Sequence, residues 1–270
     1  MSGGTGFPVP TWLIGCGNMA AAMVGGWKAA GLGFDAVTVV RPSGRPVEGI
    51  RTQVDYPVGD PPKLVLLGVK PQKLDEVVPA LEPRTGPDTI IMSMLAGVAA
   101  NSLAERFPAV RGVVRIMPNL PVQQRQGVTA VYGADAATVR EVLPLIELLG
   151  MAPVCAEERE LSVIGAVAAA GPAYVARFAA AMGLGGAGLG LDPQLAAQVA
   201  VQTLIGTAAL ADDTGESMAD IARRVASPAG TTEQGLAVLD GPDGLQPLVD
   251  RMLAAAVRRG EELADAARRN

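Results

Sequence analysis

A glycine-rich turn near the N-terminus has the residue types and spacing of a phosphate-binding loop. Gly15-Cys-Gly-Asn-Met-Ala20 fits the pattern G-x-G-x-x-A, and it lies between an apolar run at residues 11–15 and a small-residue stretch at residues 19–30. In a strand–turn–helix unit, the first glycine permits the tight turn and the second lets a pyrophosphate approach the backbone. The small third residue lets the helix pack closely on the strand. A glycine turn without a ligand is the simpler alternative, but the strand before it and the helix after it favour dinucleotide binding. The residues expected to bind the cofactor here are Gly15, Gly17, Asn18, Met19 and Ala20.

The end of the second apolar run indicates which dinucleotide binds. An NAD site usually has Asp or Glu at the end of this strand to bind the ribose hydroxyls. Residues 36–41 instead end in Arg41, and Ser43 and Arg45 follow with no carboxylate between them. A guanidinium matches the geometry of a 2′-phosphate. The alternative is a solvated basic loop. We expect NADP (as NADPH) as the cofactor, bound by Arg41 and Ser43, with NAD possible.

The residues that are missing exclude several kinds of chemistry. The 270 residues include no histidine, which excludes a Ser-His-Asp triad, a Cys-His dyad and a His-ligated zinc site. The two cysteines, Cys16 and Cys155, are too few for a thiolate cluster, so we expect no metal site. A net charge of −5 argues against nucleic acid as a partner. A small-molecule substrate is the remaining expectation.

The distribution of lysine points to one class of substrate. Reduction of a carbonyl normally needs a proton donor such as His, Lys or Tyr for the developing alkoxide. All four lysines, at positions 28, 63, 70 and 73, precede the helical half of the chain. A protonated imine is already activated, because its nitrogen gains electrons without becoming an anion. It needs orientation and a carboxylate anchor more than acid–base groups, so the composition favours imine reduction.

The elements that position these residues fall into two parts. Short apolar runs alternate with helical stretches up to about residue 157, which predicts a parallel sheet covered on both faces. From residue 158 onward the strand pattern disappears and helix formers dominate. We expect an α/β fold: a Rossmann-type doubly wound sheet at residues 1–157, followed by an all-helical dimerisation and substrate domain at residues 158–270. The expected strands are residues 11–15, 36–41, 63–69, 89–93, 111–117 and 127–132. The expected helices are 19–30, 98–106 and 135–149, and a loop is expected at 42–62. Breaks in the helical half are expected at 171–172, 183–190, 227–230 and 241–244.

Two uncharged stretches of the helical half could be confused with membrane spans. Residues 161–176 are too short to span a bilayer, and residues 193–211 contain several Gln and Thr side chains. Helices that are apolar on nearly all sides in a soluble protein are buried, often in an interface. Residues 1–8 lack the basic and apolar regions of a signal peptide. We therefore expect a cytoplasmic homo-oligomer with no membrane partner.

Further segments, in order along nearly the whole chain, resemble those of the pyrroline-5-carboxylate reductase family. The most specific is Ser227-Pro-Ala-Gly-Thr-Thr232, which is similar to the family signature Ser-Pro-Gly-Gly-Thr-Thr. The others are Gly68-Val-Lys-Pro-Gln72, Ser93-Met-Leu-Ala-Gly97, Val114-Arg-Ile-Met-Pro-Asn119, Gly171-Pro-Ala-Tyr174, Gly235-Leu-Ala-Val-Leu-Asp240 and Arg258-Arg-Gly-Glu-Glu-Leu263. The resemblance implies NADPH-dependent reduction of (S)-1-pyrroline-5-carboxylate to L-proline. It also implies a homodimer formed by the helical domain, with each site using residues from two chains, and the family leads us to expect assembly of such dimers into a larger ring.

The resemblance also assigns roles to residues. It places two strand ends, Val69-Lys70-Pro71 and Ala96-Gly97, beside the cofactor. A doubly wound sheet places them at its carboxyl edge too, where such folds bind ligands. The nicotinamide is expected near Met117, Pro118 and Asn119.

The substrate residues are expected in the second half of the chain. The turn at residues 227–232 offers successive amides suited to a carboxylate. An ordinary helix cap, with Ser227 before Pro228, is the alternative. By resemblance, Ser227, Gly230 and Thr231 hold the carboxylate, and the Thr232 hydroxyl is the catalytic group that bonds the ring nitrogen. Glu158 aligns with a carboxylate near the site, or is simply a solvated residue at the start of a helix.

The chain departs from the family pattern at several positions. Ala169-Ala170 replaces Gly-Ser, Ala229 replaces the first Gly of the signature, and Arg223-Arg224 replaces Asp-Asn. The arginines add charge near the expected site. They motivate one alternative, a reductase of another cyclic imine or imino acid. The Ala169-Ala170 replacement motivates the other, a non-catalytic NADP-binding regulator.

Overall fold

The computed structural model describes residues 6–269, so the N-terminal sequence considered above for a signal peptide lies partly outside the described residues. The chain forms two compact units. Unit 1 runs up to Ala170 and also includes the stretch from Ala256 onward, and unit 2 is Gly171–Ala255. Each unit is described by itself.

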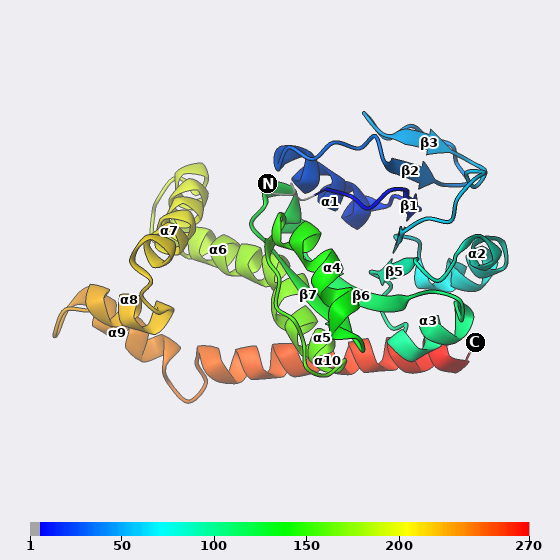
Figure 1. Ribbon diagram of the computed structural model, residues 1–270. Helices are drawn as coiled ribbons and strands as arrows, with labels where there is room; N and C mark the ends of the chain where they lie inside the picture. Colours follow the sequence, from blue (N-terminus) through cyan, green and yellow to red (C-terminus); the bar gives the residue numbers. More distant parts are fainter. Residues whose placement is uncertain (1–5, 270) are drawn as a thin grey trace. The chain divides into compact units, whose positions relative to one another are not determined.

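An eight-stranded sheet forms the centre of unit 1 and confirms the predicted α/β class (Figure 1). Its strand order is β3-β2-β1-β4-β5-β6-β7-β8, which begins with the 3-2-1-4-5-6 order of a doubly wound dinucleotide-binding sheet. Pairing is parallel from β3 to β6, β7 runs antiparallel to β6, and β8 is parallel to β7. The strands are β1 Thr11–Ile14, β2 Val37–Val40, β3 Arg51–Gln53, β4 Leu64–Leu67, β5 Ile90–Ser93, β6 Gly112–Pro118, β7 Gly127–Gly133 and β8 Gly150–Met151.

Alternate residues of the central strands enter two separate cores. In β1, Leu13 joins the cluster under α1 and α4, whereas Trp12 and Ile14 join the cluster under α2 and α3. Because both faces of the sheet are covered by helices, apolar residues are needed at every strand position. The uninterrupted apolar runs in the sequence therefore predicted these strands correctly.

The helices of unit 1 connect the strands. The α-helices are α1 Asn18–Ala29, α2 Leu74–Leu81, α3 Ala100–Arg106, α4 Ala136–Glu147 and α5 Glu160–Ile164. Three short 3₁₀ segments lie at Pro71–Lys73, Glu82–Arg84 and Leu120–Gln124, and a π-helical turn, Gly165–Ala169, follows α5.

Unit 1 contains elements that the sequence did not predict. The expected loop at residues 42–62 includes the edge strand β3, which pairs with β2 in the register Thr38 to Arg51. Helix α2 fills part of the connection from β4 to β5 and contains Pro79. The three-residue polar strand lacks an apolar run. Helix α2 does have a helical apolar pattern, with Leu74 and Leu81 buried, but it is short and its internal Pro79 argued against a helix.

Unit 2 is helical, as expected. It contains α6 Gly171–Gly188, α7 Pro193–Thr214, α8 Met218–Val225, α9 Thr231–Leu239 and the first part of α10, Leu245–Arg269. The break expected at residues 183–190 begins late in that range, because α6 continues to Gly188 before α7 starts at Pro193. A Cβ on Gly183 would lie 3.1 Å from the Ala197 Cα of α7. The glycine lets two helices pack closely instead of ending one of them.

The helices at the centre of unit 2 expose much of their apolar surface. Stretches 160–188 and 193–214 are long and apolar enough to cross a membrane by length and composition, and only 11% of each apolar window is buried in the single chain. We predicted a domain boundary after residue 157, whereas contacts divide the chain after Ala170. The difference arises because α5 packs on the sheet unit, where Leu161 shares a core cluster with Ala130 and Cys155.

Candidate functional site

The glycine-rich turn has the geometry that a pyrophosphate requires. Gly15 has φ +77°, and a Cβ there would lie 2.9 Å from Val69 Cγ1 and 3.0 Å from the Gly68 carbonyl oxygen. A Cβ on Gly17, by contrast, would meet nothing within 4 Å. Gly17 is the N-cap of α1, and no side chain caps that helix. The first amides of α1 therefore face open space and can accept an anion.

The third small residue of the motif packs the turn against the next strand. Ala20 is buried, and a Cβ on Gly68 would lie 3.2 Å from the Ala20 Cβ. Gly68 donates its N–H to the Ile14 carbonyl at 2.9 Å. The ends of β1 and β4, where the strand order reverses, are thus joined directly, and ligands bind at this reversal in doubly wound folds.

The end of β2 carries the groups expected to bind a 2′-phosphate. Arg41 Nε donates to Ser43 Oγ at 3.0 Å, and both side chains are near solvent. Burial raises the pKa of the half-buried Cys16 thiol, and the positive charge of Arg41 partly offsets that shift. The guanidinium thus lies close enough to the glycine-rich turn to influence the Cys16 thiol.

The loops after β4 and β5 lie at the carboxyl edge of the sheet, as predicted. Val69 packs against the core, whereas Lys70 is exposed just before the short helix that begins at Pro71. After β5, Gly97 has φ +77° and Ala96 is exposed. These loops present backbone and small side chains at the edge where the first turn is open.

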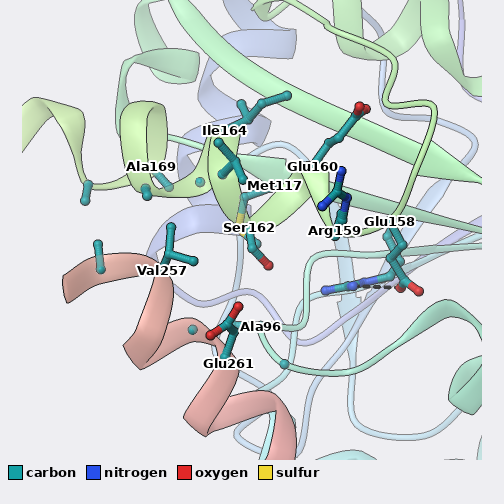
Figure 2. A pocket seen from close by; sticks show the side chains of 18 of the residues that line it. Ala96, Met117, Glu158, Arg159, Glu160, Ser162, Ile164, Ala169, Val257 and Glu261 are labelled. Carbon is teal, nitrogen blue, oxygen red and sulfur yellow. Dashed lines mark hydrogen bonds and ion pairs between the residues drawn. The ribbon is translucent and has the colours of Figure 1, made fainter. Parts of the chain in front are cut away.

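A cavity of about 1200 Å³ lies beside the second of these loops, within unit 1. Figure 2 shows Met117, Ser162 and Ala169 facing Val257 and Glu261 of α10 across it. Ala96, Gly97, the π-helical turn and several charged side chains complete its lining. The expected nicotinamide neighbour Met117 thus borders a space large enough for a ligand.

Glu158 is a connecting residue at the edge of this cavity. Its Oε1 accepts the Ala100 N–H at 2.7 Å. The same oxygen accepts a hydrogen bond from Arg115 Nη1 at 2.8 Å, drawn as the dashed line at Glu158 in Figure 2. The side chain of Arg115 is 11% exposed and that of Glu158 is 29% exposed. The pair links the start of α3 to β6, so Glu158 is more than the solvated helix-start residue that we considered.

Arg115 extends this connection and retains one unused donor. Its Nη2 donates to the Leu95 carbonyl at 3.5 Å, next to the Ala96–Gly97 loop. Its Nε is buried with no hydrogen-bond partner among the described residues. Sequence reasoning gave Arg115 no role, although a single charged residue between Val114 and Ile116 in a buried strand indicated that it needed a partner.

The side-chain amide of Asn119 forms hydrogen bonds with the backbone at both of its polar atoms. It is 5% exposed, its Nδ2 donates to the Ala168 carbonyl at 2.9 Å, and its Oδ1 accepts the Val128 N–H at 2.8 Å. The amide therefore fixes the π-helical turn to β7. The expectation that Asn119 lies near the nicotinamide stays a prediction, and these hydrogen bonds show that its side chain also holds the π-helical turn in place.

The expected substrate loop lies in unit 2, before α9. The Gly230 N–H donates to the Ser227 carbonyl at 2.9 Å, which closes a turn over residues 227–230. Helix α9 begins at Thr231, and Gly230 rather than Ser227 is its N-cap. The alternative that Ser227 caps the helix is wrong, because the turn separates it from the first helical residue. The amides of Thr231 and Thr232 lack intrahelical acceptors and remain available to an anion.

Two glycine positions of the family signature have different environments here. A Cβ on Gly230 would overlap Ser227 Oγ, so this residue must be glycine. Ala229 has φ +58°, a left-handed conformation that costs an alanine about 1–2 kcal/mol. Replacing a glycine by alanine is mild only where φ is negative. The turn instead keeps the glycine-type backbone with an alanine in it.

The arginines that depart from the family pattern are both paired. Arg223 bonds Asp220 within α8, and Arg224 Nη2 lies 2.9 Å from Glu216 Oε2. Their added charge is therefore balanced within the same part of unit 2.

Chemically, the described groups can bind a dinucleotide and a small carboxylate and can offer a hydroxyl to a polar atom. Thr232 is half-buried in the first turn of α9, next to the free amides. Sequence reasoning also missed Glu233, whose position three residues after Gly230 resembles a capping-box spacing. Ala229 donates its N–H to Glu233 Oε2 at 2.7 Å.

Comparisons with known proteins show which family the chain resembles. A family model described as pyrroline-5-carboxylate reductase dimerisation matches residues 158–263. The pyrroline-5-carboxylate reductase of Pseudomonas aeruginosa is 33% identical over 263 residues, which are 94% of this chain and 96% of that protein. The enzyme of the same name from Escherichia coli is 29% identical over 262 residues, covering 93% and 97% of the two chains.

Solved structures extend the comparison to the fold. A pyrroline-5-carboxylate reductase from Coxiella burnetii has a TM-score of 0.85 and 27% identity, covering 95% of this chain and 98% of that one. The pyrroline carboxylate reductase of Plasmodium falciparum, solved with NADP bound, shares the fold at a TM-score of 0.80 and 18% identity, covering 96% and 100%. The Pseudomonas relative aligns over nearly the full length of both proteins, and this chain therefore belongs to the pyrroline-5-carboxylate reductase family.

Proposed function

We propose that the protein reduces (S)-1-pyrroline-5-carboxylate to L-proline with NADPH. The observation that carries this proposal is the nearly full-length match to a pyrroline-5-carboxylate reductase. The chain also has Ser227, Gly230, Thr231 and Thr232 in a segment that resembles the family signature. The absence of histidine from the chain, and of lysine from its helical half, agrees with a substrate that needs little acid–base catalysis.

The cofactor residues proposed are those of the glycine-rich turn and the carboxyl edge. Gly15 and Ala20 shape the turn, and Gly17 leaves the space through which a pyrophosphate reaches the amides of Asn18 and Met19. Arg41 and Ser43 hold the 2′-phosphate, which favours NADPH over NADH. The cofactor, when bound, supplies the hydride that reduces the C=N carbon. The loops proposed to lie along it are Val69-Lys70-Pro71 and Ala96-Gly97, and Asn119 positions the cavity wall.

The substrate is held at the start of α9. The Thr231 amide binds its carboxylate within the turn that Ser227 and Gly230 form, because the N-terminus of a helix favours an anion. The Gly230 N–H shapes this turn, since it is donated to the Ser227 carbonyl. The Thr232 hydroxyl bonds the ring nitrogen and orients or relays its proton. Glu158 contributes by fixing Arg115 and the start of α3.

Oligomerisation is part of this proposal. The apolar helices of the matched dimerisation region, residues 158–263, are covered by a second copy rather than by lipid, in a homodimer of the helical domain that can assemble further into a ring. We propose residues 1–157 as the cofactor domain and 158–270 as the dimerisation and substrate domain, with the start of the matched region as support. A cytoplasmic location suits a reductase that depends on NADPH.

The deciding experiment is a steady-state assay of the purified full chain. NADPH oxidation is followed at increasing concentrations of pyrroline-5-carboxylate, with proline quantified as the product, and the assay is repeated with NADH and with a six-membered cyclic imino acid. We expect turnover with a preference for NADPH and for the five-membered ring. A strong preference for the six-membered ring would replace the proposed substrate. Undetectable oxidation by folded protein would favour a non-catalytic NADP-binding protein.

A further inference from the structure

The expected substrate loop already binds a carboxylate that belongs to the protein. Glu233, the third residue of α9, extends back along the helix so that its Oε2 accepts the Ala229 N–H at 2.7 Å. Glu233 is exposed, and Ala229 is exposed beside it. The loop amide proposed for the substrate therefore has an anion next to it before any ligand arrives.

The local backbone explains why this contact is favourable. Ala229 is held at φ +58° by the turn that the Ser227–Gly230 hydrogen bond closes. A hydrogen bond from a backbone amide to an ionised carboxylate is about twice as strong as one between neutral groups. The carboxylate also lies at the positive end of the α9 dipole. Glu233 thus stabilises both the strained turn and the helix start.

The substrate carboxylate needs the same surroundings as the Glu233 carboxylate: the turn, a backbone amide donor and the positive end of α9. The substrate carboxylate is proposed to bind the Thr231 amide, two residues after Ala229 in the chain. Two carboxylates around one turn repel each other, and they compete for the same positive end of the helix. Because Glu233 is exposed, its side chain can rotate into solvent when the substrate arrives, at the cost of its hydrogen bond.

We propose that Glu233 is a specificity-determining residue that competes internally with the substrate carboxylate. It weakens the binding of carboxylate-bearing cyclic imines and raises their KM, while leaving the hydride-transfer step unchanged. The inference rests on the proposed function, since it concerns the same loop and the same substrate.

The test compares Glu233→Gln with the unchanged enzyme on two substrates. One is pyrroline-5-carboxylate, and the other is 1-pyrroline, which has the same ring without the carboxylate. Glutamine keeps an oxygen that can accept the Ala229 N–H but removes the charge. We expect KM for pyrroline-5-carboxylate to fall about three- to tenfold, from the loss of one nearby like charge at the protein surface. We expect kcat, and KM for 1-pyrroline, to stay within about twofold of the unchanged enzyme, because the charge acts on the carboxylate alone.

A matched control tests whether the effect is local. Asp192 accepts the Leu195 N–H at 3.0 Å and caps α7 in the same unit, away from the loop in sequence. Asp192→Asn removes a helix-capping charge in the same way, and KM for both substrates should stay as in the unchanged enzyme. Glu233→Ala serves as a second variant, since it removes the charge and the acceptor together and should also lower KM for pyrroline-5-carboxylate.

The possible results separate the inference from the proposed function. If both Glu233 variants leave KM for pyrroline-5-carboxylate equal or higher, Glu233 only supports the turn and the inference is wrong. Equal changes for the two substrates, or the same change in Asp192→Asn, would overturn it as well. Those results leave the proposed function intact, because the unchanged enzyme still reduces pyrroline-5-carboxylate. If the unchanged enzyme has no activity, the proposed function fails and the inference fails with it.

Discussion

Replacing Gly17 with alanine should weaken cofactor binding, whereas replacing Gly15 with alanine should lower the stability of the fold. The two glycines are two residues apart in one turn, yet their surroundings differ. A Cβ on Gly17 enters space with no atom within 4 Å, whereas one on Gly15 lies 2.9 Å from Val69 Cγ1. Gly15 also has φ +77°, and Gly17 as N-cap has φ −79°. Alanine is therefore compatible with the backbone at position 17 and incompatible with it at position 15.

The expected magnitudes follow from these surroundings. At Gly17 the added methyl group occupies the space proposed for the pyrophosphate, and overpacking of about 1–3 kcal/mol raises the Kd for NADPH roughly 5- to 150-fold. At Gly15 the left-handed backbone costs about 1–2 kcal/mol and the steric overlap about 1–3 kcal/mol more. A loss of roughly 2–5 kcal/mol lowers Tm by about 4–20 °C in a chain of this size.

Two measurements on each variant decide the matter. Thermal unfolding without cofactor gives the stability, and titration of NADPH by protein fluorescence gives Kd. We expect Gly17→Ala to keep its Tm within a few degrees of the unchanged protein and to lose NADPH affinity. The main effect of Gly15→Ala should be a lower Tm. If Gly17→Ala bound NADPH as tightly as the unchanged protein, the pyrophosphate could not pass over this turn. If it lost as much Tm as Gly15→Ala, the reasoning from open space would be wrong.

Four further changes test other parts of the site and fold. Arg41→Ala should weaken NADPH far more than NADH in the same titration, and equal weakening would refute the 2′-phosphate role. Thr232→Ala should lower kcat by about ten- to a thousandfold, and unchanged turnover would remove the hydroxyl from the mechanism. Glu158→Gln should lower the free energy of unfolding in urea by roughly 1–3 kcal/mol, because it leaves a buried guanidinium unpaired; no change would mean that the pair is not stabilising. The pKa of Asp135 is lowered chiefly by the hydrogen bond that the Thr138 hydroxyl donates to it. The ionised carboxylate therefore stabilises the fold at neutral pH, and this stabilisation is lost as the pH falls below the usual carboxyl pKa of about 4. Asp135→Asn should lose less Tm between pH 5 and pH 2 than the unchanged protein, and identical pH profiles would contradict this.

Patterns within a few neighbouring residues predicted the central part of the fold. The runs that became β1, β4 and β5 are buried on both faces, so their apolar character was continuous and visible in the sequence. The edge strand β3, with the residues Arg51-Thr-Gln53, lacks such a run because its side chains face a partly open edge. Gly183 of α6 resembled the start of a helix end, and only its close approach to Ala197 shows that it packs against α7.

The sequence by itself determined the chemistry that is available. The absence of histidine, the spacing of Gly15, Gly17 and Ala20, and the lack of a carboxylate after Arg41 are properties of residue identity, and no packing can change them. Tertiary structure decided which groups are already engaged. Arg115 and Glu158 are 43 residues apart and meet only because β6 and the start of α5 adjoin. Ala229 and Glu233 are close in sequence, but the left-handed turn that aims one at the other is a property of the folded backbone. Hydrogen bonds depend on distance and direction, so residue types can suggest them and only the folded chain determines which of them form.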